Sequence, residues 1–168
     1  MKQALVGAIL LLTLAFAGCR NGCADVTCLN GGSCKDGECE CTYRYGGRYC
    51  DTFCAAGYEG LNCSVASRQK YLRQWNATTR STLGVTVKHT LNIAPAGNIN
   101  NFYIINFNNE GYTIIATVSA STTFDIYPQN ASGSYTGKVS GSGHIEGNRL
   151  SINLTKQGGP DYFADCNP

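Results

Sequence analysis

The second half of the chain consists of short segments in which apolar and polar residues alternate. Residues 84–93, GVTVKHTLNI, place every second side chain in one apolar row that only His89 interrupts. A period of two residues is typical of a β-strand with one buried face. Further apolar segments of strand length are residues 101–107, 112–120, 122–128, 134–147 and 149–155.

Turn-forming residues separate these segments. NNEG at 108–111, PQNASG at 128–133 and EGN at 146–148 are rich in Asn, Gly and Pro, and the Gly147-Asn148 step is typical of a tight hairpin. No segment shows a helical period. Six to eight short strands predict an antiparallel meander over residues 71–168. Because its inner face is apolar, the meander must close as a small barrel or form a sandwich.

Residues 23–63 have a different composition. They hold eight of the ten cysteines in the chain and few Val, Ile, Leu or Phe residues. A segment this short with so little apolar surface needs disulfides or a metal to fold. Spacing alone leaves about a hundred ways to pair eight cysteines. A bond between Cys39 and Cys41 would be badly strained, so each must pair elsewhere.

The cysteine-rich segment resembles EGF-like modules. CLNGGSC is followed by a C-x-C, and CAAGYEGLNC at 54–63 fits the closing pattern of such modules at every position. CTYRYGGRYC at 41–50 has the same spacing, with Arg44 in place of a glycine. Two consecutive closing loops resemble the eight-cysteine, laminin-type variant. That resemblance implies four disulfides, namely Cys23–Cys34, Cys28–Cys39, Cys41–Cys50 and Cys54–Cys63.

Residues 1–18 have the features of an export signal. A single Lys precedes the apolar run ALVGAILLLTLAFAG, which is too short for a spanning helix. LAFAGC resembles the cleavage box of bacterial lipoproteins, with Phe16 where the family more often has Leu. The resemblance implies that Cys19 carries the lipid and that residues 19–22 form the anchored N-terminus. The alternative is ordinary secretion of an unlipidated protein. Both alternatives lead to an oxidising compartment.

The second half also resembles known proteins. KYLRQW at 70–75 resembles the strand that opens lipocalin-like barrels, with Arg73 in place of the usual glycine and Trp75 keeping the aromatic. NNFYIINF, TIIATVSA and GKVSGSGHIEGNRLSINLT resemble the C-terminal half of small EGF-bearing lipoproteins of Bacteroidetes-type bacteria. The order of anchor, module at 23–63, linker at 64–70 and β-domain at 71–168 agrees with that group. The resemblance implies an outer-membrane lipoprotein and no particular activity.

The sequence offers no catalytic set and no metal site. The acids of the β-domain are scattered, and no Ser lies in a G-x-S-x-G motif. The segment before the first cysteine of the module, CRNG, lacks the carboxylates of calcium-binding EGF-like modules. Oxidised cysteines cannot bind zinc. We therefore expect no enzyme, no metal and no cofactor, and the net charge of +2 is too small to indicate nucleic acid.

Binding remains the expected role. His89, inside an apolar row, is either a hydrogen-bonded core or rim residue or a polar anchor in a ligand cavity. No acid lies between Glu59 and Glu110, and Arg73 and Arg80 belong to this basic block. With Trp75 they are the candidates for an exposed aromatic and basic surface that binds a glycan or an envelope protein. The competing hypothesis is a lipocalin-like carrier of a small apolar ligand.

The state of the remaining cysteine, Cys166, depends on whether Cys19 is lipidated. If Cys19 carries lipid, nine cysteines remain and Cys166 is the odd one, either free or bridging two copies of the chain. If Cys19 is not lipidated, the two cysteines can form a disulfide.

Overall fold

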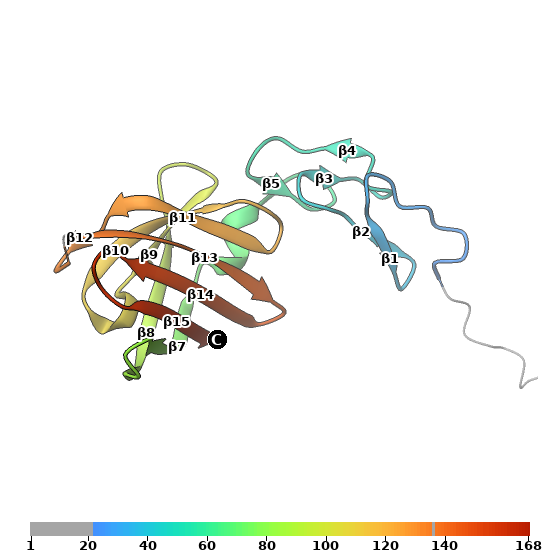
Figure 1. Ribbon diagram of the computed structural model, residues 1–168. Helices are drawn as coiled ribbons and strands as arrows, with labels where there is room; N and C mark the ends of the chain where they lie inside the picture. The colour runs from blue at the N-terminus through green and yellow to red at the C-terminus, as the bar shows by residue number, and fades with distance from the viewer. Residues whose placement is uncertain (1–21, 136) are drawn as a thin grey trace, which may run out of the picture.

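The computed structural model describes residues 22–135 and 137–168. A small cysteine-rich module precedes a closed β-barrel, and the module extends from one end of the barrel (Figure 1). The described residues contain two short 3-10 helices, η1 (Ser67–Tyr71) and η2 (Phe107–Asn109), and no α-helix. The predicted signal peptide of residues 1–18 and the predicted lipidation site at Cys19 lie outside the described residues.

The module is built from three two-stranded antiparallel hairpins. Their strands are β1 (Ser33–Lys35), β2 (Glu38–Glu40), β3 (Tyr45–Gly46), β4 (Thr52–Phe53), β5 (Tyr58–Glu59) and β6 (Val65–Ala66). Four disulfides hold them together, namely Cys23–Cys34, Cys28–Cys39, Cys41–Cys50 and Cys54–Cys63. These are the four pairs that the EGF-like resemblance implies. Strands of two or three residues cannot stabilise themselves, so the disulfides do so.

The two closing loops have the same backbone shape. Gly57 in the second loop has φ +91°, and Arg44 at the matching place in the first loop has φ +67°. Positive φ favours glycine, so Arg44 adopts a conformation that costs a side chain free energy. Its guanidinium lies over the ring of Phe53, 4.5 Å from the ring centroid. This contact helps to offset the backbone cost.

The second region is a closed antiparallel barrel. Its eight main strands are β7 (Gln74–Ser81), β8 (Thr86–Pro95), β9 (Asn101–Ile105), β10 (Tyr112–Val118), β11 (Thr123–Asn130), β13 (Lys138–Glu146), β14 (Arg149–Lys156) and β15 (Asp161–Asn167). Each strand pairs with the next in the chain, and β15 pairs with β7. The short β12 (Ser132–Gly133) pairs with β10. The predicted antiparallel meander is confirmed, and it closes as a barrel.

One predicted turn can be followed residue by residue. Glu146 pairs with Arg149 across the hairpin between β13 and β14, which leaves Gly147 and Asn148 as its two turn residues. Gly147 has φ +57°, as a tight two-residue turn requires. The hairpin prediction from the Gly147-Asn148 step is confirmed.

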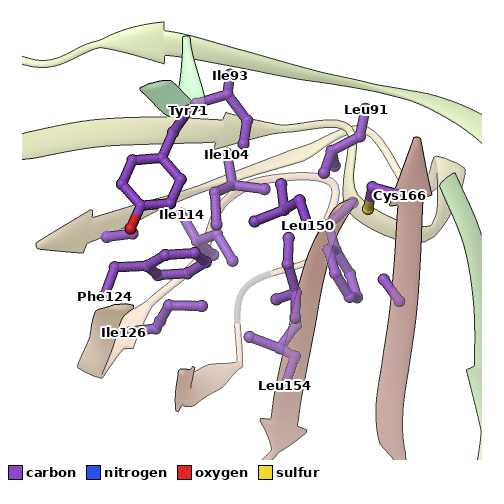
Figure 2. Close-up of a cluster of buried hydrophobic side chains, with 14 of the residues drawn as sticks. Tyr71, Leu91, Ile93, Ile104, Ile114, Phe124, Ile126, Leu150, Leu154 and Cys166 are labelled. Atoms are coloured by element: carbon purple, nitrogen blue, oxygen red, sulfur yellow. The ribbon is translucent and has the colours of Figure 1, made fainter. Parts of the chain in front are cut away.

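The interior of the barrel is filled by side chains. Trp75, Phe102, Phe124 and Tyr71 are fully buried. Figure 2 shows Tyr71 of η1 close to Phe124, Ile104 and Ile114, which come from three different strands. The ring centroids of Tyr71, Phe102 and Phe124 lie 5.0–5.3 Å apart in stacked and edge-on arrangements. The Trp75 indole Nε1 donates a hydrogen bond to the carbonyl oxygen of Tyr71 at 2.9 Å, so its polar atom is satisfied inside the core.

The barrel closes at a short seam between β10 and β11. Only Thr117–Asp125 and Val118–Phe124 pair there, and β11 is bulged against β13 between Ile126 and Gln129. Beyond these two pairs, the side-chain amide of Gln129 forms the hydrogen bonds to β10 that a strand backbone would otherwise form. Its Oε1 accepts a hydrogen bond from the Ile115 N–H at 2.8 Å, and its Nε2 donates to the Ile115 carbonyl at 2.6 Å. The seam is therefore the most weakly paired part of the barrel.

Candidate functional site

The module and the barrel are joined by a structured connection. Residues 64–70, the expected linker, contain β6 and most of η1. The Arg68 guanidinium Nη1 donates hydrogen bonds to the backbone carbonyls of Ala96, Asn98 and Asn101, at 2.7, 2.6 and 2.8 Å. A charged donor shared by three carbonyls is a strong restraint. Arg68 therefore ties η1 to the loop between β8 and β9.

A second contact at the junction involves Lys70. Its ammonium forms an ion pair with Glu59 of β5 and donates to the carbonyl oxygen of Ser121, at 2.5 Å, in the loop between β10 and β11. Gly57 approaches the barrel closely as well, because a Cβ atom added there would lie 2.5 Å from the Ile99 side chain. Two residues of the basic block of the sequence, Arg68 and Lys70, therefore hold the junction together.

A half-open groove of about 870 Å³ lies along the module and reaches the barrel at Lys70 and Ser121. Its apolar side chains include Leu61 and Val65, which are 64% and 46% exposed. Its acidic side chains are Asp36, Glu38, Glu40 and Glu59. Its basic side chains are Arg48 and Lys70. Exposed apolar side chains within a charged rim are typical of a surface that receives another molecule.

The charges of the groove are not balanced. Glu59 is paired with Lys70, and Glu40 is paired with Lys35 at 3.2 Å. Among the residues that the structure describes, Asp36 and Glu38 have no ion-pair partner. Arg48 also has no ion-pair partner there, but the four acidic side chains of the groove outnumber its two basic ones, which favours a ligand with basic groups.

The structure does not bring the predicted aromatic and basic residues together on one surface. Trp75 is buried in the core, and the Arg73 guanidinium lies 5.0 Å from its ring centroid. Arg80 lies at the opposite end of β7, where it pairs with Asp165 at 3.5 Å. Seven residues of extended strand separate the two arginines by about 23 Å. They cannot contact the same small ligand.

His89 lies on the inner face of β8, as its alternation predicted, but at the barrel end away from the module. Its Nε2 accepts a hydrogen bond from the Asn108 backbone N–H at 3.0 Å, and its ring lies edge-on to Phe107. The Nδ1 is buried without a partner. Burial lowers the pKa of His89 below 6.5. The residue is a hydrogen-bonded rim histidine, and it does not line the groove along the module.

A cluster that the sequence analysis missed closes the same end of the barrel. Lys156, the last residue of β14, is only 6% exposed. Its ammonium forms an ion pair with Glu110 and lies 4.5–4.9 Å from the ring centroids of Tyr112, Tyr135 and Tyr162. Alternation along β14 puts Lys156 in the same inner row as Leu150, Ile152 and Leu154. The sequence pattern therefore indicates that Lys156 faces the interior of the barrel.

Glu110 also receives hydrogen bonds from two further side chains. The Asn108 Nδ2 donates to its Oε1 at 2.6 Å, and the Tyr162 hydroxyl lies 3.5 Å from the same atom. Burial alone raises the pKa of this carboxyl. The hydrogen bonds from Lys156 and Asn108 outweigh that effect and hold the pKa of Glu110 below its usual value. The resting state of the cluster is therefore an ion pair.

Cys166 is fully buried on the inner face of β15 and has no disulfide partner among the described residues. Burial raises the pKa of its thiol to about 12. A bridge from this thiol to a second copy of the chain would require the barrel to open. Cys19, the other predicted partner of Cys166, lies outside the described residues.

No group of three or more His, Cys, Asp or Glu residues that could hold a metal ion occurs within residues 22–135 and 137–168. In the same ranges, no helix has the length and apolar character needed to cross a membrane. The four disulfides are those of a protein that folds in an oxidising, extracytoplasmic compartment.

Comparisons with known proteins give no family. No family model matches the chain, and no curated protein matches it. Two redesigned beta barrels are similar in structure. One covers 61% of this chain and 94% of its own, with 12% identity and a TM-score of 0.47. The other, mFAP1 bound to DFHBI, covers 61% and 98%, with 16% identity and a TM-score of 0.47. At these identities and TM-scores, the similarity does not indicate a ligand or an activity for this chain.

Proposed function

We propose that this chain is a non-enzymatic binding protein of the bacterial cell envelope, anchored through lipid on Cys19. The groove along the module is its binding surface, and a basic, partly apolar segment of an envelope protein is its ligand. The observation that carries the proposal is the groove itself, with Leu61 and Val65 exposed beside the unpaired acids Asp36 and Glu38. A glycan without positive charge fits this surface less well.

The junction supports this proposal. Because Arg68 and Lys70 tie the module to the barrel, the groove is held in one shape before a ligand arrives. A preformed site loses less entropy on binding than a flexible one. The barrel then serves as a rigid support, and the module as the part that binds.

The barrel fold is compatible with ligand binding, and a lipocalin-like carrier was the competing hypothesis. A carrier needs an interior cavity, whereas large aromatic side chains fill the interior here. Small eight-stranded barrels have interiors just wide enough for their own side chains. The packing around Trp75, Phe102 and Phe124 therefore favours a binding site outside the barrel.

The proposal is tested by photo-crosslinking in the cells that make the protein. A photoreactive amino acid replaces Leu61 in the groove, and in a second strain it replaces Leu83, which is 76% exposed in the turn between β7 and β8. We expect a discrete protein adduct from position 61 and none from position 83. Equal labelling from both positions, or none from either, would contradict the groove as a binding surface.

A charge reversal sharpens the same experiment. Asp36→Lys with Glu38→Lys should abolish the adduct from position 61, because the ligand is attracted by the unpaired acids. Glu146→Lys with Asp161→Lys makes the same change in net charge on the outside of the barrel and should leave the adduct intact. The anchor is tested separately, since labelled fatty acid should be incorporated into the wild type and not into Cys19→Ser.

A further inference from the structure

Glu110 brings an amine and a carboxamide side by side. One oxygen of its carboxylate, Oε2, contacts the Lys156 ammonium, and the other, Oε1, accepts the hydrogen bond from Asn108 Nδ2 at 2.6 Å. Both oxygens are bonded to the same carbon, so the two nitrogen atoms are neighbours across a single carboxylate. Lys156 comes from the end of β14, and Asn108 from the loop between β9 and β10.

Asn108 is also held from its backbone. Its N–H donates to His89 Nε2 at 3.0 Å, and its φ of +56° is one that few residues other than Asn and Gly adopt. Lys156 is fixed by the three tyrosine rings around its ammonium. Two reacting groups that fixed neighbours hold beside the same carboxylate gain the rate advantage of an intramolecular reaction.

We propose that Lys156 and Asn108 form an intramolecular isopeptide bond, with Glu110 transferring the protons. The Lys156 ammonium gives a proton to the Glu110 carboxylate, and the neutral Nζ attacks Asn108 Cγ. Glu110 returns a proton to Nδ2, the Cγ–Nδ2 bond breaks, and ammonia leaves. The released ammonia carries away the second proton that Lys156 loses, and it leaves as ammonium. The Nζ–Cγ bond that forms is an amide, so no oxidant, reductant or co-reactant is needed.

Two features of the cluster bear on the barrier. The tyrosine rings stabilise the ammonium, which opposes the first proton transfer. The Tyr112 hydroxyl is buried without a partner, and the ring of Tyr112 lies 4.9 Å from the Lys156 ammonium, so the cluster holds a spare hydrogen-bond donor.

The bond would cross-link two elements of the barrel that are far apart in the chain. It joins the end of β14 to the loop between β9 and β10, at the barrel end opposite the module. The neighbouring seam between β10 and β11 has only two paired positions. An isopeptide bond resists both reductants and proteases, so it would protect the barrel where disulfides protect the module.

The test is peptide mass spectrometry on the full-length protein, unfolded, reduced and digested with trypsin. No Lys or Arg lies between His89 and the cleavage site after Lys138, so Asn108 lies in peptide 89–138. We expect that peptide to be joined to peptide 150–168, uncleaved after Lys156, with a mass lower by one NH₃ than the sum of the two. Linear peptides 89–138, 150–156 and 157–168 at their full masses would overturn the proposal and leave a salt-bridged cluster only.

Variants identify the role of each group. Glu110→Gln should abolish the branched peptide, because glutamine cannot accept and return a proton, and Lys156→Arg should abolish it while keeping the positive charge. Glu146→Gln, on the exposed side of β13, should leave the branched peptide unchanged. A branched peptide that persists in Glu110→Gln would overturn the role of Glu110. A linear peptide with Asn108 converted to Asp would show that water, not Lys156, reaches the carbonyl.

Discussion

The module and the barrel belong to one chain but are stabilised against unfolding in different ways. In the module the buried hydrophobic residues are Cys50 and Cys54, and four disulfides hold strands of two or three residues. In the barrel more than twenty apolar side chains are buried in one cluster, and its single cysteine, Cys166, has no disulfide partner in the part of the chain that the structure describes. The module limits the freedom of its unfolded chain, whereas the barrel removes apolar surface from water. The two regions should therefore respond to different perturbations.

Reduction should have the largest effect, and only on the module. Each disulfide contributes about 2–4 kcal/mol, so losing four removes on the order of 10 kcal/mol from a region with almost no core. We expect residues 23–63 to lose hydrogen-exchange protection in reductant while residues 74–167 keep theirs. Simultaneous loss of protection in both regions would show that the barrel depends on the module.

Deleting a core side chain should reverse that pattern. Trp75→Ala removes a fully buried indole and should lower the free energy of unfolding of the barrel by about 3–5 kcal/mol. Denaturant unfolding followed by circular dichroism measures this loss. Tyr127→Ala, whose side chain is 61% exposed, is the matched control and should change stability by less than about 0.5 kcal/mol. The four module disulfides should still form in both variants.

Cutting the junction should uncouple the two regions without unfolding either. Arg68→Ala leaves the carbonyls of Ala96, Asn98 and Asn101 without their charged donor and should cost about 1–3 kcal/mol. We expect faster hydrogen exchange in residues 96–101 and a broader distribution of module–barrel distances in solution scattering. Lys88→Ala, which removes an exposed basic residue of β8, should change neither measurement.

The smallest effect concerns pH and the far end of the barrel. Because the pKa of His89 is below 6.5 in the folded protein, the unfolded chain binds the proton more readily. The contribution of His89 to stability is therefore present above about pH 6.5 and is lost as the pH falls below it. We expect a small loss of stability between pH 7 and 5. His89→Gln should flatten this slope in denaturant titrations.

The strands themselves were predictable where the inner row is strongly apolar. β8, β10, β11 and β14 alternate apolar and polar side chains, β9 is a nearly continuous apolar run, and β13 has apolar residues at only two inner positions, Val139 and Ile145. The structure confirms strands in all of these segments. The pattern of apolar residues does not mark β15, and it marks β7 only at its Trp75 end. Their inner rows contain Ala77, Thr79 and Ala164, which are too small or too polar to mark a buried face in the sequence.

The sequence by itself determined where disulfides and where apolar burial stabilise the chain, because both depend on local composition. It also placed His89 on an inner face, because alternation is a local property. Only the tertiary structure decided that Arg73 and Arg80 lie apart, that Arg68 and Lys70 hold the junction, and that Asn108, Glu110 and Lys156 meet. The reason is physical, since those contacts depend on how strands far apart in the chain pair and on where the barrel closes.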